Sequence, residues 1–217
     1  AAIANWKQVI TTAGTDTNYR ELATRSLYMV GVTQLDQAMA AAGPDKATQA
    51  RDAAGTFKQL FTQMKDSPEA PSIMQSWSES LQMAGDEASI PTIYADMLAK
   101  PANYSEGVLT LAGSFASIRQ KPEDAIALFE GALVANPFSH DALLNLPLLY
   151  NSKSDYEKML PPARKSVELE PNNSTAWMWF AYYAQGKANA VKIPTAKNKA
   201  APTPAEVKAI KDSAAVR

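Results

Sequence analysis

Several residue types and sequence patterns are missing from this chain, and each absence narrows its function. The sequence has no cysteine, which excludes disulfide bonds, a thiolate nucleophile and a zinc site built on sulfur. No uninterrupted apolar run approaches the roughly 18 residues expected of a membrane-spanning helix. The formal net charge is -1, so the chain as a whole lacks the basic excess typical of nucleic-acid-binding proteins. We therefore expect no nucleic-acid partner and no transmembrane segment.

Catalytic motifs are missing as well. The only histidine, His140, lies between Ser139 and Asp141 at a predicted helix start, where either neighbour has a ready role as a helix cap. No nucleophile elbow, phosphate-binding glycine loop or metal-binding histidine pair accompanies it. The members of a Ser-His-Asp triad converge only in the fold, so the sequence leaves that arrangement open. We expect no catalytic residue, no cofactor and no metal site.

Carboxylate pairs are the remaining candidates for acid and base chemistry. Asp86-Glu87 and Glu123-Asp124 stand at predicted helix starts, and Glu168 and Glu170 lie towards a helix end. A favourable helix dipole or simple solvation explains these positions more directly than catalysis does. An enzyme that uses paired carboxylates remains the less favoured alternative.

What the chain does contain is enough apolar material to fold, arranged with a long period. Hydrophobic residues make up 46% of the sequence and charged residues 20%, which argues against extensive disorder. Pro137 ends the segment EDAIALFEGALVANP, and Pro171 ends the similar segment DYEKMLPPARKSVELEP. We call the interval between these two prolines the repeat step. A fixed period of about 34 residues, which this step matches, is the mark of stacked two-helix units.

Small and aromatic residues recur beside these prolines. Ala125, Phe129 and Ala132 precede Pro137, and the preceding segment carries Leu109, Ala112, Gly113 and Ala116 at helical spacing. The pattern resembles the tetratricopeptide repeat. In that family a small residue in each helix lets two helices approach closely, an aromatic residue fills the space beside them, and a proline turns the chain. The resemblance implies an all-α, right-handed solenoid of antiparallel helix pairs that acts as a scaffold for a partner.

Repeat steps from this unit define the proposed domain organisation. One repeat step after the four positions of the first helix stand Leu143, Leu146, Pro147 and Tyr150. A second step leads to Trp177, Phe180, Ala181 and Ala184. With one extra residue an earlier unit contains Met74, Trp77 and Leu81, followed by Ile90, Tyr94, Met97 and Pro101. We expect repeats at 71–104, 106–139, 140–173 and from 174 onward. Phe180 and Ala181, like Ala125, Phe129 and Ala132, should lie between helices. An ordinary helical bundle is the competing interpretation, because periodicity within one helix does not separate the two.

The unit at 140–173 departs from this pattern. Pro147 stands inside its first helix, and Pro161-Pro162 stand inside its second. An interior proline removes a backbone hydrogen bond and clashes with the carbonyl four residues earlier, at a cost of about 3 kcal/mol or more. We therefore expect these helices to bend or break.

The two ends of the chain differ from the repeats. Residues 1–70 should form two helices of some 20 residues after Asp16, separated at Gly43-Pro44 and preceded by the remnant of another helix at 3–11. They form either a divergent pair of the same kind or a cap over the first regular unit. Residues 185–217 hold seven basic and two acidic residues and read as a basic linker followed by a terminal helix that opens at Thr203-Pro204-Ala205-Glu206.

The family resemblance implies a binding surface on the concave face, formed mainly by the first helix of each unit. Its positions pass from polar to apolar along the chain, and they are Gln75, Glu79, Gln82, Thr110, Ser114, Ser117, Asp141, Leu144, Leu148, Asn151, Met178 and Tyr182. Some members of the family bind the terminal carboxylate of a partner with lysine and asparagine at these positions, but this chain has Thr110, Ser114, Leu144 and Leu148 instead. The apolar end suits an apolar stretch of peptide, or the chain's own C-terminal segment.

The resulting functional hypothesis is a non-enzymatic scaffold that binds another protein or an extended peptide. An accessory or sensor domain of a larger bacterial protein, with its activity elsewhere, is the main alternative, and an enzyme is the least favoured class. The start at Ala1 without methionine favours an extracytoplasmic location, periplasmic or secreted, over the cytoplasm. Partner, pathway and oligomeric state do not follow from the sequence.

Overall fold

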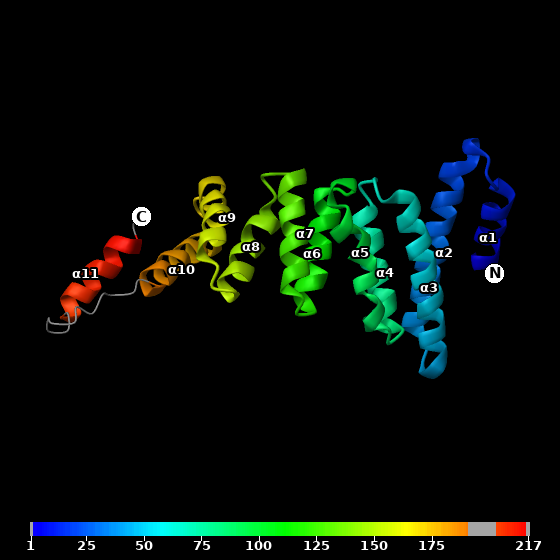
Figure 1. Ribbon diagram of the computed structural model, residues 1–217. Helices are drawn as coiled ribbons and strands as arrows, with labels where there is room; N and C mark the ends of the chain where they lie inside the picture. The colour runs from blue at the N-terminus through cyan, green and yellow to red at the C-terminus, as the bar shows by residue number, and fades with distance from the viewer. Residues whose placement is uncertain (1, 191–202, 216–217) are drawn as a thin grey trace.

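A computed structural model describes residues 2–190 and 203–215, and every regular element in those ranges is helical. The helices follow one another along an elongated stack from α1 to α11 (Figure 1). In chain order they are α1 (Ala2–Ala13), η1 (Thr17–Tyr19), α2 (Arg20–Ala40), α3 (Gly43–Met64), α4 (Ala70–Met83), η2 (Glu87–Ser89), α5 (Pro91–Ala99), η3 (Pro101–Asn103), α6 (Glu106–Ile118), α7 (Pro122–Ala135), α8 (His140–Ser152), α9 (Tyr156–Leu169), α10 (Ser174–Ala190) and α11 (Pro204–Ala215).

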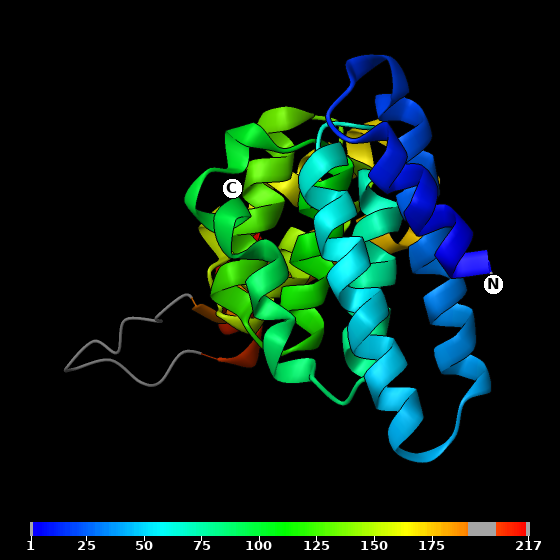
Figure 2. The same ribbon diagram turned by 90° about the vertical axis from the view of Figure 1, so that its right-hand side faces the viewer.

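The N-terminal helices are long, as expected. α2 has 21 residues and α3 has 22, and the turn that joins them projects beyond the rest of the molecule (Figures 1 and 2). α1 lies along the upper half of α2 (Figure 2). Between them, Asp16 accepts a hydrogen bond from the Asn18 N–H at 2.9 Å and caps η1. Gly31 of α2 lies beneath the buried ring of Phe57 in α3, so this pair also packs a small residue against an aromatic ring.

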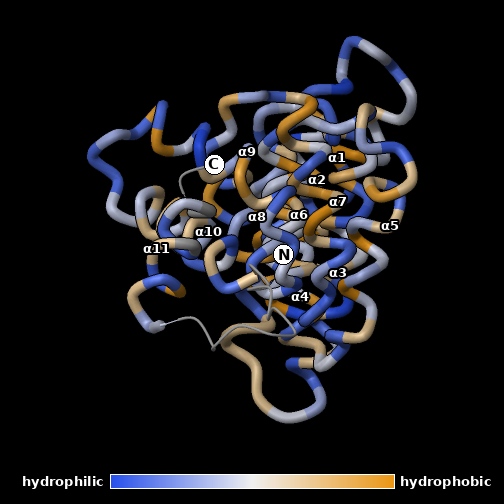
Figure 3. The backbone as a smooth tube through the Cα atoms, turned by 60° about the vertical axis from the view of Figure 1, so that its left-hand side comes forward, coloured by the Kyte–Doolittle hydropathy of each residue, from blue (hydrophilic) through white to orange (hydrophobic). Residues whose placement is uncertain are grey.

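One large hydrophobic core runs through the stack from Leu27 in α2 to Tyr183 in α10, and a small second cluster joins Ala38, Ala50 and Ala84. The apolar segments gather in its middle, around α6 and α7 (Figure 3). Ala125, Phe129 and Ala132 are fully buried, and a Cβ built on Gly113 would come within 3.0 Å of the Phe129 ring. The packing of small residues against an aromatic ring between α6 and α7 is therefore confirmed.

The unit with one extra residue is present but less regular. All six of its expected packing residues are buried, namely Met74, Trp77, Leu81, Ile90, Tyr94 and Met97. However, α4 packs mainly against α3, whereas the nine-residue α5 contacts α6 and α7. The second helix of this unit, α5, is thus short, and it packs on the next unit instead of lying along α4.

The turns between first and second helices repeat one backbone conformation. Gly85, Gln120 and Ser154 have φ values of 72°, 56° and 57°, in the left-handed region. After each of them the next N–H donates back to the carbonyl five residues earlier, with N···O distances of 2.9 Å for Asp86 to Leu81, 3.0 Å for Lys121 to Ala116 and 2.9 Å for Asp155 to Tyr150. This is the Schellman ending of a helix, which favours glycine at the left-handed position.

The prolines of the third unit do not break their helices. α8 continues through Pro147, and α9 continues through Pro161 and Pro162. Pro161 and Pro162 lie in the second turn of α9, where the carbonyls that lose their partners belong to the exposed residues Glu157 and Lys158 and can reach water. The expectation of a break is therefore wrong for both helices, and the bend that the sequence also allowed stays a prediction.

The packing face of α10 is narrower than expected. Ala176 and Tyr183 are buried one repeat step after Ala142 and Leu149, but Trp179 is buried in place of its neighbour Phe180. Ala181 is exposed and Phe180 only half-buried, so the prediction that both lie between helices is wrong for Ala181. Gly186 lies against the ring of Tyr156, on the same side of α10 as the buried Trp179 and Tyr183.

The terminal helix begins as predicted. Thr203 Oγ1 accepts from the Glu206 N–H at 3.3 Å, and the Thr203 N–H donates to Glu206 Oε2 at 2.8 Å, which is a capping box. α11 packs on α10. The linker expected before it falls at 191–202, outside the described residues.

The left-handed turns lead to a stability prediction. Replacing Gln120 with glycine should stabilise the protein by about 0.5–1 kcal/mol. A left-handed conformation costs an ordinary residue about 1–2 kcal/mol, and glycine avoids this cost. The greater conformational freedom of glycine in the unfolded chain offsets part of the stabilisation. Gln59→Gly, at an exposed helical position of α3, should instead destabilise by about 1 kcal/mol. Urea unfolding followed by circular dichroism measures both, and equal destabilisation by the two changes would contradict the assignment of the turn.

A second prediction concerns the contact between Gly186 of α10 and Tyr156 of α9. A Cβ on Gly186 would come within 2.1 Å of Tyr156 Cε1, so Gly186→Ala must displace the ring and should destabilise by about 1–3 kcal/mol. Gly55 of α3 has no atom within 4 Å of such a Cβ, so Gly55→Ala should stabilise by about 1 kcal/mol through helix propensity. Thermal melts of both variants provide the comparison. A Gly186→Ala melt like that of the unchanged protein would show that the contact is unimportant.

Candidate functional site

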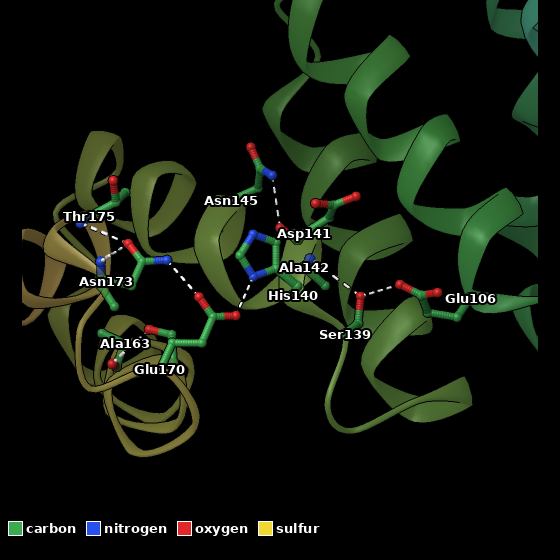
Figure 4. A network of polar contacts seen from close by, with 12 residues as sticks. Glu106, Ser139, His140, Asp141, Ala142, Asn145, Ala163, Glu170, Asn173 and Thr175 are labelled. Atoms are coloured by element: carbon green, nitrogen blue, oxygen red, sulfur yellow. Dashed lines mark hydrogen bonds and ion pairs between the residues drawn. The ribbon is translucent and has the colours of Figure 1, made fainter.

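The first helices of the repeats, α4, α6, α8 and α10, form a row held partly by polar contacts between their N-terminal ends. Ser139, the N-cap of α8, accepts from the Ala142 N–H at 3.4 Å and donates its hydroxyl hydrogen to Glu106 in the first turn of α6 (Figure 4). The expected capping role of Ser139 is confirmed. The contact places the N-terminal ends of α6 and α8 next to each other.

A second chain of contacts joins α8 to α10. Nδ1 of His140 pairs with Glu170, whose other oxygen accepts from Asn173 Nδ2 at 2.6 Å (Figure 4). Asn173 Oδ1 in turn accepts from the Thr175 N–H at 2.9 Å and so caps α10. The hydrogen bonds from Asn173 and His140 lower the pKa of Glu170. His140 is thus paired with Glu170 and Ser139 with Glu106, so the two do not assemble the triad that the sequence left open.

The opposite ends of the first helices are tied to the second helices by ion pairs that follow the repeat. Lys153 at the end of α8 pairs with Glu123 in the first turn of α7, at 2.7 Å. Lys187 of α10 and Glu157 of α9, each one repeat step later, form the equivalent pair. Hydrogen bonding to Lys153 lowers the pKa of Glu123, and hydrogen bonding to Glu157 raises the pKa of Lys187. Sequence reasoning missed these pairs, although the recurrence of both charges at the repeat step was available to it.

The polar half of the predicted surface lies on α4 and α6. Gln75, Glu79 and Gln82 share one exposed face of α4, and Gln75 Nε2 donates to Glu79 Oε1 at 2.8 Å. On α6, Ser114 and Ser117 are half-buried. Thr110 is only 5% exposed, and its hydroxyl donates to the backbone of its own helix. Its side chain is therefore unavailable to a partner.

The apolar half lies on α8 and α10, which contact one another. Leu148, Met178 and Tyr182 are 43%, 40% and 42% exposed, which is high for large apolar side chains in the middle of helices. Asp141 is exposed, whereas Leu144 and Asn151 are half-buried.

Trp177 is exposed, although sequence reasoning assigned it to the core. It is 49% exposed, its indole N–H donates to the Pro171 carbonyl at 2.8 Å, and its ring meets Phe180 edge to face at 6.2 Å. It lies about 140° around α10 from Tyr182, on a different side of the helix. We call Leu148, Met178 and Tyr182, the exposed apolar side chains of the predicted surface on α8 and α10, the apolar patch.

Sequence reasoning also missed a hollow between α2 and α4 with a volume of about 570 Å³. Its lining includes Arg25 and Tyr28 of α2, Met64 of α3, and Glu69 and Ile73 beside or within α4. Tyr28 is 44% exposed, and because this exposure depends on how α2 packs, the sequence pattern did not mark it. The hollow contains both basic and acidic side chains.

Within residues 2–190 and 203–215, no helix combines the length and apolar character needed to cross a membrane. In those same ranges, no group of three or more histidine, aspartate or glutamate side chains is placed to hold a metal ion.

Comparison with known proteins identifies the fold. No family model matches the sequence, and no curated protein matches it. The structure is similar to the crystal structure of a tetratricopeptide repeat protein from Parabacteroides merdae ATCC 43184, with a TM-score of 0.54 and 16% identity over 76% of this chain. The match spans 60% of that protein's length. MamA protein gives a TM-score of 0.40 at 13% identity, over 98% of this chain and 86% of MamA. The first of these matches shows that the chain has the all-helical fold of a tetratricopeptide repeat protein.

Proposed function

We propose that the protein is a non-catalytic scaffold that binds a segment of another protein along the row of α4, α6, α8 and α10. The observation that carries the proposal is the apolar patch on α8 and α10. Soluble proteins rarely leave a contiguous apolar surface of large side chains free without a use. The tetratricopeptide repeat fold supports it, because repeats of this kind present extended concave surfaces to partners.

The rest of the row suits recognition and offers no reaction centre. Its polar end holds side-chain amides and hydroxyls, which can hydrogen-bond to a peptide. Ser139, His140 and Glu106 are engaged in the contacts between repeats, so the histidine of the row and the serine beside it already have structural partners. The surface therefore favours binding over catalysis.

Leu148 provides the test. Leu148→Asp places an unpaired carboxylate in the patch, where burial against a partner would be costly. Selection of random twelve-residue peptides on the unchanged protein should enrich a set of binders, and their affinity for the variant should fall at least about tenfold. Leu148 is 43% exposed, so the variant should keep its helical content.

A matched variant completes this experiment. Leu22 in the first turn of α2 is 49% exposed and lies away from the patch, so Leu22→Asp should leave peptide affinity unchanged. Binding that survives Leu148→Asp but fails in Leu22→Asp would move the binding surface to the N-terminal helices and overturn the proposal. Unfolding of Leu148→Asp would contradict it too, because Leu148 would then belong to the core.

A further inference from the structure

The row of first helices is charged differently from the rest of the stack. α4, α6 and α8 contain no lysine or arginine, and the one basic residue of α10, Lys187, pairs with Glu157. Their acidic residues are Glu79, Glu106 and Asp141. By comparison, the second helix α9 carries three basic residues, Lys158, Arg164 and Lys165. The face that we propose for binding is therefore acidic, although the chain as a whole is almost neutral.

Two of these three carboxylates are open to a partner. Glu106 is engaged by Ser139. Glu79 is exposed, and its only contact in the described chain is the neutral amide of Gln75, which leaves Oε2 free. Asp141 is exposed, and no side chain of the described residues pairs with its carboxylate. Glu79 and Asp141 thus offer negative charge that no cation within the described fold neutralises.

We propose that the segment bound by this row combines apolar residues with a lysine or arginine, the apolar residues on the apolar patch and the basic residue on Glu79. The proposal rests on the scaffold function above and specifies the chemistry of its partner. Glu79 lies two first helices away from Leu148. Packed helices lie about 8–10 Å apart, and α6 and α8 meet mainly at their N-terminal ends, so the two contacts are separated by at least about 20 Å. An extended peptide rises about 3.3 Å per residue, which places the basic residue at least about six positions from the apolar ones.

The geometry also selects against acidic segments. A glutamate or aspartate at that position would face Glu79, and α4, α6 and α8 contain no lysine or arginine that could compensate. Electrostatic complementarity of this kind contributes more to discrimination between partners than to total affinity. The expected signature is a preference between peptides of equal apolar content.

The test uses three fluorescein-labelled synthetic peptides and the full 217-residue chain. All three share a Leu-Phe-Leu cluster, and six positions away they carry two arginines, two glutamines or two glutamates. Fluorescence anisotropy at about 0.05 M salt should rank the affinities as arginine above glutamine above glutamate. The preference for arginine should shrink at about 0.5 M salt, where exposed charges are screened.

Protein variants assign the preference to one carboxylate. Glu79→Gln should reduce the arginine-to-glutamine ratio about two- to fivefold, the size of effect expected when one exposed ion pair is lost. Glu168→Gln removes an equally exposed acid from the second helix α9 and should leave that ratio unchanged. Leu148→Asp should weaken all three peptides together.

The outcomes separate this inference from the function on which it rests. Equal affinity for the three peptides, together with loss of binding in Leu148→Asp, would support the scaffold function and contradict the proposal that the bound segment carries a basic residue. A ratio that Glu79→Gln leaves unchanged would do the same. Peptides that bind equally to the unchanged protein and to Leu148→Asp would overturn the scaffold surface itself.

Discussion

The close approach of paired helices at a glycine beneath an aromatic ring is the constraint on which the stack depends. It occurs between Gly31 and Phe57, between Gly113 and Phe129, and between Gly186 and Tyr156. At each contact a methyl group in place of hydrogen would come within 3.0 Å of ring carbons or closer. Because protein interiors are close-packed, the position of such a glycine fixes both the distance between two helices and the face that each turns inward.

This constraint explains which parts of the fold could be predicted from the sequence. The unit at 106–139 was predictable, because Gly113, Phe129 and the adjacent alanines are local in sequence and occur at repeat spacing. The face of α10 was predictable only in part. The repeat step correctly locates the N-cap of α10 at Asn173 after that of α8 at Ser139, and Ala176 and Tyr183 are buried one step after Ala142 and Leu149. The exposure of Trp177 and the contact of Gly186 with Tyr156 lie outside the pattern that the repeat supplies.

The candidate surface was predictable only in outline. The helices that form it followed from the repeat, and the high exposure of Leu148, Met178 and Tyr182 agrees with a surface role. Thr110 and Trp177 lie in environments opposite to those expected, since Thr110 is buried and Trp177 is exposed. Both depend on contacts between elements distant in sequence, and the periodicity of one helix carries no information about such contacts.

The repeated ion pairs between α7 and α8, and between α9 and α10, act at the outer edge of each joint. Exposed pairs of this kind contribute little to stability, so they do not hold the stack together. They join the last turn of a first helix, or the residue just after it, to the first turn of a second helix. Salt screens exposed charges, so ionic strength affects how firmly these helix ends are held together more than it affects stability.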